Sequence, residues 1–367
     1  MMDIFIIKAI LVFITAMLTN LIIIYWFARG TYKFKKRNDI NAVQASHVIP
    51  VARIGGISII IALILSAMPF LEVQNSWPYY WLLLLSAFPV FVIGLCEDLG
   101  YLASPRLRLL AATFSGIVFM ISTGLWLPRT DIPVLDFAMQ WAPFGVGFSL
   151  FVAVGVSHSF NLIDGLNGLA GCTAIGVGLS LAIMSHQIGL DGHRNSLLLL
   201  CCAIAGFLVF NYPFGKIFLG DAGAYAIGHV MIWMAISILC ASSSITPFAM
   251  LLIFFWPVAD TLLAIIRRVY LGVPISNPDR LHFHQLVMRG IEIVLLGRKR
   301  RHISNPLATA LILPLIFAPM AVGVLLALNS FEAMMACVYF AILFVSAYKA
   351  FVWMVCRYRY SIRSKKF

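Results

Sequence analysis

Residues 222–241 read AGAYAIGHVMIWMAISILCA, a run without Asp, Glu, Lys or Arg. A helix of about 20 such residues is long enough to cross the hydrocarbon core of a bilayer. Comparable apolar runs occur near residues 4–28, 54–71, 79–96, 109–127, 144–160, 166–186, 195–212, 245–266, 306–328 and 331–353. These runs lack the alternating pattern of barrel strands. Within lipid, every backbone N–H and C=O group must be hydrogen-bonded inside the protein, and a helix does this within a single segment. The sequence therefore predicts an all-α, polytopic membrane bundle of about 11 transmembrane helices.

The composition agrees with this prediction. Of the 367 residues, 62% are hydrophobic and 11% are charged, whereas about a quarter of the residues in soluble domains are charged. We find no internal repeat, so residues 1–367 are expected to form a single integral membrane domain. The longest stretch between runs, 267–305, is expected to be a large cytoplasmic loop, with residues 283–296 forming an amphipathic helix at the membrane interface.

The basic residues predict the orientation of the chain. Alternate loops hold 22 Lys and Arg on one side of the membrane, against two, Arg129 and Arg194, on the other. Because basic loops stay in the cytoplasm, we expect a periplasmic N-terminus and a cytoplasmic C-terminus. Contact with anionic membrane lipids then accounts for the net charge of +12 without nucleic acid.

Four polar segments fall on the expected cytoplasmic side. They are Glu97-Asp98, FNLIDGLNGL at 160–169, FNYPFGKIFLGDAG at 210–223 and PDRLHFHQLVMRG at 278–290. Carboxylates, amides, glycines and histidines gathered at one membrane face suggest phosphoryl chemistry at a lipid surface.

Glu97 and Asp98 end the third apolar run. Adjacent carboxylates at a helix C-terminus are unfavourable, and a phosphate with bound Mg²⁺ would relieve their repulsion. A solvated loop with Arg106 and Arg108 nearby is the alternative.

Asn161 and Asp164 stand three residues apart, which places them on one face of a helix. Gly165 and Gly168 permit close approach of a ligand to the backbone, and a polar break of this kind lines water or a cavity. The alternative is a simple turn in which Asp164 caps the next helix.

Asp221 precedes an apolar run between small residues. Asp is a preferred N-cap, but a helix N-terminus also favours phosphate, so the position suits a metal and a pyrophosphate together. Lys216 and Asn211 add a cation and an amide on the same loop.

His282 and His284 follow Arg280 in the most basic loop. Arginine and histidine both suit a pyrophosphate. Zinc is a weaker alternative, since H-x-H lacks a third clear ligand, and a surface pair without function is another.

Asp260 lies inside an apolar run. An ionised carboxylate there costs roughly 3 kcal/mol or more unless it is paired. We expect Arg267 or Arg268 as its partner, in a supporting or purely structural role.

The segments, in this order, resemble the polyprenyl-phosphate N-acetylhexosamine-1-phosphate transferase family. The resemblance spans roughly residues 46–290 and includes SHVIPVARIGG at 46–56, Glu97-Asp98, NLIDGLNGLAG at 161–171, FLGDAG at 218–223 and the histidine loop. It implies eleven membrane spans, a bacterial inner-membrane location and an active site that faces the cytoplasm.

The resemblance also implies a reaction. Undecaprenyl phosphate attacks the sugar-proximal phosphorus of a UDP-N-acetylhexosamine, with Mg²⁺ or alternatively Mn²⁺ as cofactor, and gives a lipid pyrophosphate sugar and UMP. It implies a metal-binding role for Asp221 and catalytic roles for Asp98, Glu97 and Asp164, with Asp98 and Glu97 positioning or deprotonating the lipid phosphate. The substrate-binding residues it implies are His47, Arg53, Asn161, Gly165, Leu166, Asn167, Asn211, Lys216, Phe218, Arg280, His282 and His284.

Three residues depart from the family pattern: Glu97 stands where Asp is usual, Asn167 where several members have Asp, and Gln285 where many have His. These departures favour a relative that starts an O-antigen, a capsule or another surface glycan over the peptidoglycan translocase itself. A homodimer and the identity of the sugar stay open. The alternative function is a transporter or flippase of a lipid-linked or anionic substrate, which would place charges near the membrane midplane.

Overall fold

The computed structural model describes residues 2–29, 51–66, 77–101, 104–274 and 281–364. Within these ranges the regular elements are helical, and Ala52 and Ile217 form an isolated parallel bridge. The helices are α1 (Met2–Ala28), α2 (Gly56–Ser66), α3 (Trp77–Asp98), α4 (Pro105–Thr123), α5 (Pro133–Met139), α6 (Ala142–Ile163), α7 (Leu169–Gln187), α8 (Asp191–Asn211), α9 (Gly220–Ala241), α10 (Pro247–Ile253), α11 (Phe255–Tyr270), α12 (Phe283–Ile291), α13 (Arg301–Leu325) and α14 (Ser330–Ser364).

The prediction of an all-helical, multi-pass membrane protein is confirmed. Nine helices in the described ranges are long and apolar enough to cross a membrane, and a tenth span results if α10 and α11, which meet at 80°, are counted together. The predicted number of eleven is therefore higher than the described residues show. The expected span at 54–71 is represented by α2, an 11-residue helix, and the positions after Ser66 lie outside the described ranges.

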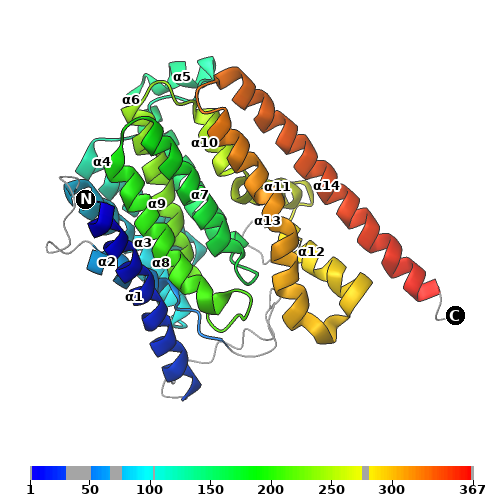
Figure 1. Ribbon diagram of the computed structural model, residues 1–367. Coiled ribbons are helices and arrows are strands. Elements are labelled where there is room, and N and C mark those ends of the chain that lie inside the picture. Colours follow the sequence, from blue (N-terminus) through cyan, green and yellow to red (C-terminus); the bar gives the residue numbers. More distant parts are fainter. Residues whose placement is uncertain (1, 30–50, 67–76, 102–103, 275–280, 365–367) are drawn as a thin grey trace.

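Helix α9 forms the centre of the bundle (Figure 1). Every residue from Gly220 to Leu239 is buried, and α2, α3, α4, α6 and α7 pack around it. A helix that is apolar on all sides is either enclosed by other helices or surrounded by lipid, and α9 is enclosed. The outer helices instead present large apolar side chains outwards, such as Ile7 and Ile10 of α1, as expected of surfaces that face lipid.

Glycines allow α2 and α3 to approach the start of α9. A Cβ atom at Gly94 of α3 would lie 2.5 Å from the backbone nitrogen of Ala222, and one at Gly56 of α2 would collide with the backbone of Gly223. Small residues permit such close contact between membrane helices. The start of α2 and the last turns of α3 thereby lie directly against the start of α9.

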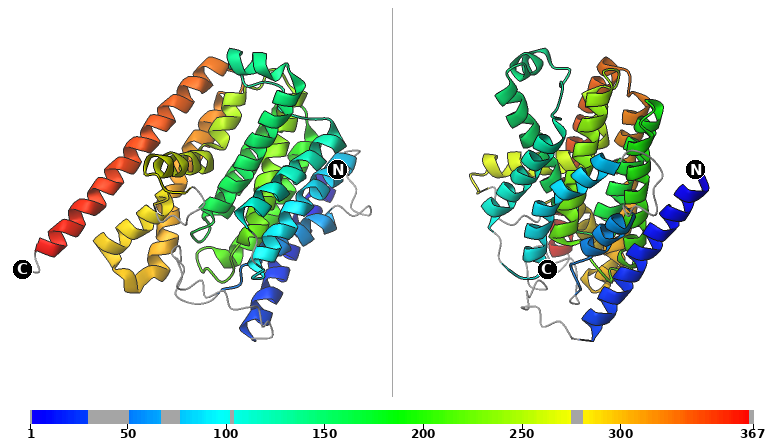
Figure 2. Two further views of the ribbon diagram at one scale, coloured as in Figure 1. Left: turned by 180° about the vertical axis from the view of Figure 1, so that it is seen from behind. Right: turned by 90° about the vertical axis from the view of Figure 1, so that its left-hand side faces the viewer.

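Helices α10 to α14 form a second part of the bundle, in which α14 runs along the outer edge (Figure 2). The predicted amphipathic helix is confirmed as α12, which is followed by a π-helical turn at Glu292–Leu296. Helix α12 packs against α13 and α14, and its expected position at the membrane interface stays a prediction.

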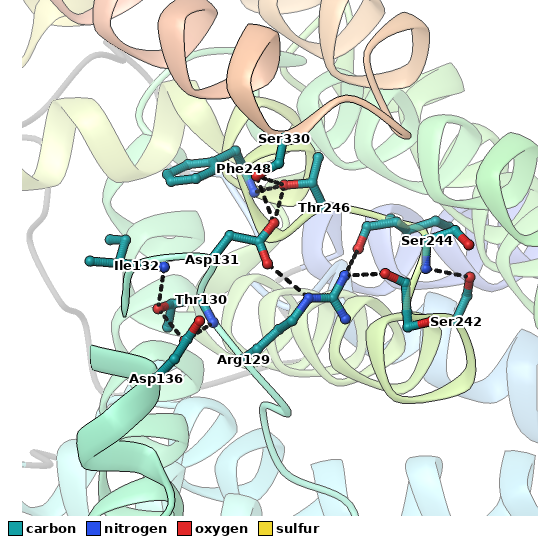
Figure 3. A network of polar contacts seen from close by, with 12 residues as sticks. Arg129, Thr130, Asp131, Ile132, Asp136, Ser242, Ser244, Thr246, Phe248 and Ser330 are labelled. Atoms are coloured by element: carbon teal, nitrogen blue, oxygen red, sulfur yellow. Dashed lines mark hydrogen bonds and ion pairs between the residues drawn. The ribbon is translucent and has the colours of Figure 1, made fainter. Parts of the chain in front are cut away.

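A polar network joins the loops at the end of the bundle where α4 finishes (Figure 3). The carboxylate of Asp131 accepts hydrogen bonds from Arg129 Nε at 2.8 Å, from Thr246 Oγ1 at 2.7 Å and from Ser330 Oγ at 2.8 Å. Arg129 also donates to the carbonyl oxygen of Ser243 at 2.6 Å. The network ties together the α4–α5, α9–α10 and α13–α14 connections.

We expect Asp131→Asn to destabilise the protein at neutral pH. Burial opposes ionisation of Asp131, but the hydrogen bonds from Thr246, Ser330 and Arg129 outweigh it and hold its pKa below the usual range. Ionised Asp131 therefore stabilises the fold above a pH of about 4, and this contribution is lost as the pH falls through the folded-state pKa. At pH 7 the substitution should lower the free energy of unfolding by about 1 kcal/mol.

Thermal unfolding in detergent at pH 7 and at low pH measures this difference. Asp191→Asn is the matched control, because Asp191 pairs with Arg194 at 2.7 Å in a more exposed position and such pairs contribute little. Equal losses in the two variants would contradict the prediction.

Candidate active site

The N-terminus of α9 receives carboxylates from two other parts of the chain. Asp98, the last residue of α3, accepts the N–H groups of Asp221 and Ala222, both at 2.9 Å. Asp164, which follows α6, accepts the N–H group of Gly220 at 3.2 Å. The first N–H groups of a helix have no partner within the helix, and negative charge is favourable there. Three successive N–H groups are thus satisfied by two acids.

This arrangement corrects two interpretations of the sequence. Asp221 is not the N-cap of α9, because it is the second residue of the helix and Asp98 supplies the capping oxygens. Asp164 caps α9 and not the following helix α7, whose N-cap position holds Gly168. The N–H groups of Gly220, Asp221 and Ala222 already have acceptors in Asp98 and Asp164, and the expected binding of a metal and a pyrophosphate beside Asp221 stays a prediction.

The carboxylate of Asp221 is surrounded by donors. Asn161 Nδ2 donates to Oδ1 at 3.0 Å, the Arg53 guanidinium lies 3.7 Å from Oδ1, and the Arg108 guanidinium lies 3.5 Å from Oδ2. The structure therefore gathers Asp98, Asp164 and Asp221, which are far apart in the sequence, around a single helix start.

Arg108 also belongs to this site, although from the sequence it was expected only to lie near Glu97 and Asp98. It lies in the first turn of α4, where the helix dipole disfavours a cation. An arginine at an unfavourable helix start suggests a function elsewhere in the protein. This feature of the sequence could have identified Arg108 as a site residue.

Glu97 is buried beside Asp98, with 4% of its surface exposed. The alternative of a solvated loop start is therefore wrong for Glu97.

Asn167 and Asn211 hold the loops of the site together. Asn211 accepts the N–H group of Gly168 and donates to the carbonyl of Ile217, both at 2.7 Å. Asn167 donates to the carbonyl of Pro213 at 2.9 Å. Oδ1 of Asn167 is buried without a hydrogen-bond partner among the described residues. The predicted role of both asparagines in holding a nucleotide stays a prediction.

The other predicted substrate-binding residues are distributed unevenly. Leu166 is buried in the core, Phe218 is half-buried beside the site, and Lys216 is exposed with its ammonium group 5.4 Å from the Phe214 ring centre. His47 and Arg280 lie outside the described residues.

His282 and His284 pack deep in the protein and not on its surface, with 2% and 0% of their surfaces exposed. Asp260 lies between them: its carboxylate is 3.1 Å from Nδ1 of His282 and 3.5 Å from Nδ1 of His284. The expected pairing of Asp260 with an arginine is therefore wrong, and Arg267 donates instead to Tyr348 Oη at 2.9 Å. The histidines lie closer to Asp260 in space than do the arginines, which follow it about two turns along the same helix.

Gly165 connects the histidine pair to the carboxylates. A Cβ atom at residue 165 would lie 2.6 Å from Nε2 of His284, so the absence of a side chain lets the imidazole lie directly against the Asp164–Gly165 backbone. Among the described residues, no three His, Cys, Asp or Glu side chains form a ligand set for a metal ion.

Asp164 differs electrostatically from an ordinary acid. Burial raises its pKa to about 7, the nearby carboxylate of Asp221 adds to the increase, and Arg53 and the Gly220 N–H group oppose it. A further positive charge close to Asp164 and Asp221, in addition to Arg53 and Arg108, would reduce the repulsion between the two carboxylates.

Comparison with known proteins gives consistent relationships. Residues 80–239 match the family model described as Glycosyl transferase family 4. A probable undecaprenyl-phosphate N-acetylglucosaminyl 1-phosphate transferase of Bacillus subtilis is 30% identical over 299 residues, which cover 78% of this chain and 79% of that protein.

Two further relatives have related names. An undecaprenyl-phosphate alpha-N-acetylglucosaminyl 1-phosphate transferase of Escherichia coli O157:H7 is 28% identical, with 72% of each chain covered. A phospho-N-acetylmuramoyl-pentapeptide-transferase of Aliarcobacter butzleri is 29% identical, with 63% of this chain and 72% of that protein covered.

We expect Asp164→Asn to change the dependence of stability on pH. Because the pKa of Asp164 is higher in the folded than in the unfolded chain, ionisation of this acid destabilises the fold as the pH rises from about 4 to about 7. The asparagine variant should match the wild type at about pH 3, where Asp164 is largely protonated in both the folded and the unfolded chain, and it should unfold at a higher temperature at pH 8. Thermal unfolding in EDTA at both pH values measures this; a lower unfolding temperature of the variant at pH 8 would contradict it.

Gly220→Ala should disrupt the start of α9. Gly220 has φ of 77°, a conformation that costs roughly 1–2 kcal/mol with a side chain. A Cβ atom there would also collide with the carbonyl oxygen of Arg53 and lie 2.5 Å from Oδ2 of Asp98.

The measurement is the unfolding temperature in detergent, which we expect to fall. Gly155→Ala is the control, since a Cβ atom at that position of α6 meets nothing within 4 Å and Ala is the better helix former. A variant at Gly220 as stable as this control would refute the close packing described here.

Proposed function

Because the chain belongs to glycosyl transferase family 4, we propose that it transfers an N-acetylhexosamine 1-phosphate from a UDP-sugar to undecaprenyl phosphate. A phosphate oxygen of the lipid forms a bond to the sugar-proximal phosphorus, and the bond from that phosphorus to UMP breaks. The products are an undecaprenyl pyrophosphate sugar and UMP. The observation that carries this proposal is the convergence of Asp98, Asp164 and Asp221 at the start of α9.

The location of these acids favours a transferase over a transporter. Asp98 ends α3, Asp164 follows α6 and Asp221 begins α9, so all three lie at one end of long helices. A transporter would be expected to carry such groups near the membrane midplane. With the basic loops on the same side, we place the site at the cytoplasmic face of the bacterial inner membrane.

Mg²⁺ fits the side chains at this site. Hard cations prefer carboxylate and amide oxygens, and Mg²⁺ usually binds one or two carboxylates and completes its shell with water and substrate phosphates. Asp221 would hold the ion, with the Asn161 amide beside it. When bound, Mg²⁺ supplies positive charge that offsets the charge of the pyrophosphate.

Asp98 acts by positioning in this proposal. Each of its oxygens already accepts an N–H group of α9, which fixes the backbone of Asp221. The lipid phosphate needs little help from a base, because the second pKa of a phosphomonoester is near 6. Placement and charge neutralisation are expected to dominate, as in other phosphoryl transfers.

Arg53 and Arg108 are suited to bind phosphate oxygens. Their distances of 3.7 and 3.5 Å to Asp221 exceed those of a tight charge-assisted hydrogen bond. Both guanidinium groups are partly exposed, so each can reach an incoming anion while staying beside Asp221.

The family departures at Glu97, Asn167 and Gln285 support a pathway other than peptidoglycan synthesis. We propose that the product starts an O-antigen, a capsule or a similar surface glycan. The choice among UDP-N-acetylhexosamines is an experimental question, which a panel of UDP-sugars offered to the purified protein answers directly.

We expect Asp221→Asn and Asp98→Asn each to reduce UMP release by roughly 100-fold or more. The first removes the charge that would hold Mg²⁺. The second replaces one of two accepting oxygens by an NH₂ group that faces a backbone N–H group. The assay supplies undecaprenyl phosphate, Mg²⁺ and the UDP-sugar panel.

Asp191→Asn, at the opposite end of the bundle, should keep wild-type turnover. Unfolding temperatures show whether each variant is folded. Normal turnover by both site variants would refute the proposed mechanism.

A further inference from the structure

Asp260 contacts the histidine loop and has no role in the proposed transfer reaction. Its Oδ2 atom lies 3.1 Å from Nδ1 of His282, and its Oδ1 atom accepts the N–H group of Phe283 at 3.0 Å. Nδ1 of His284 lies 3.5 Å from Oδ2, which is too far for a hydrogen bond. One carboxylate on α11 thus faces both imidazoles and the start of α12.

These contacts define where the proton of His282 sits. An ionised carboxylate can only accept hydrogen bonds, so Nδ1 of His282 carries the hydrogen. In the neutral ring Nε2 is then an acceptor. The backbone N–H group of Phe283 can only donate, and it donates to Oδ1 of Asp260. This hydrogen bond keeps the carboxylate in its orientation.

The Nε2 atoms point away from Asp260. The two rings are nearly parallel, with centres 5.7 Å apart and planes at 20°, and Nε2 of His284 lies against Gly165. Both Nε2 atoms are buried and have no hydrogen-bond partner among the described residues. A buried polar atom without a partner is costly, and a ligand at the Asp164–Gly165 loop would provide one.

We propose that Asp260 is a positioning residue that holds His282 and His284 with Nδ1 toward its carboxylate and Nε2 away from it, so that both Nε2 atoms, of which that of His284 lies at the Asp164–Gly165 loop, accept hydrogen bonds from the nucleotide sugar. This inference rests on the proposed function and specifies which groups of the nucleotide sugar the two histidines bind. A neutral Nε2 atom binds O–H or N–H groups, which sugar hydroxyls and acetamido groups supply, and not phosphate oxygens. Burial lowers the pKa of His284, which keeps that ring neutral at cytoplasmic pH.

Asp260→Asn is the variant that separates positioning from packing. The asparagine carboxamide has nearly the same shape as the aspartate carboxylate. Its oxygen must face the Phe283 N–H group, which needs an acceptor. The NH₂ group then faces Nδ1 of His282, which must become an acceptor, so the hydrogen moves to Nε2. This is the tautomer argument established for the aspartate of serine proteases, applied to a different site.

The experiment measures side-chain ¹⁵N shifts of histidine-labelled protein in detergent at pH 8, without substrate. His282→Gln and His284→Gln assign the signals. We expect Nδ1–H with unprotonated Nε2 at His282 in the wild type, and the opposite tautomer in Asp260→Asn. In the UMP-release assay, kcat of Asp260→Asn should fall by roughly 100-fold with its unfolding temperature close to that of the wild type.

Thr261→Val is the matched control. It alters the neighbouring residue of α11, whose hydroxyl donates only to the Pro257 carbonyl at 2.8 Å among the described contacts, and it should leave the His282 tautomer and kcat unchanged.

A wild-type His282 that carries a hydrogen on Nε2 would overturn the inference, and this result requires no variant to fold. A tautomer change in Asp260→Asn with normal kcat would also overturn it. Absence of UMP release by the wild type would instead refute the proposed function, because the nitrogen shifts are measured without substrate.

Discussion

The hydrogen bonds from the N–H groups of Asp221 and Ala222 to Asp98 are the interaction on which the site depends. The start of a buried helix presents N–H groups that neither the helix nor water can satisfy, and leaving them unpaired is costly. Asp98 satisfies two of them from α3. The same contacts fix the backbone of Asp221, and so the position of the carboxylate that meets Arg53, Arg108 and Asn161 follows from a requirement of folding.

The same solution recurs in the structure. Asp164 accepts from Gly220 at the start of α9, and Asp260 accepts from Phe283 at the start of α12. In each case an acid of one helix or loop satisfies the start of another helix. These acids therefore join separate parts of the chain in addition to supplying negative charge.

The histidine pair depends on the C-terminal part of the chain. The Phe283 ring packs against Trp256 and Phe344, with ring centres 5.0 and 5.3 Å apart. Tyr348 of α14 donates to the carbonyl of Leu281 at 3.0 Å. Helix α14 thus supports the segment that carries His282 and His284, although it lies beyond residues 80–239, where the family model matches.

The sequence by itself determined the helical membrane architecture, because about 20 apolar residues in a bilayer leave the backbone no other stable form. It also identified Asp98, Asn161, Asp164, Asp221, His282 and His284, since polar residues between apolar runs are costly without a purpose. Only the tertiary structure decided their partners. Contacts between distant segments determine that Asp98 and Asp164 cap α9, that His282 faces Asp260, and that Asn167 and Asn211 hold loops together. These contacts follow from how the helices pack.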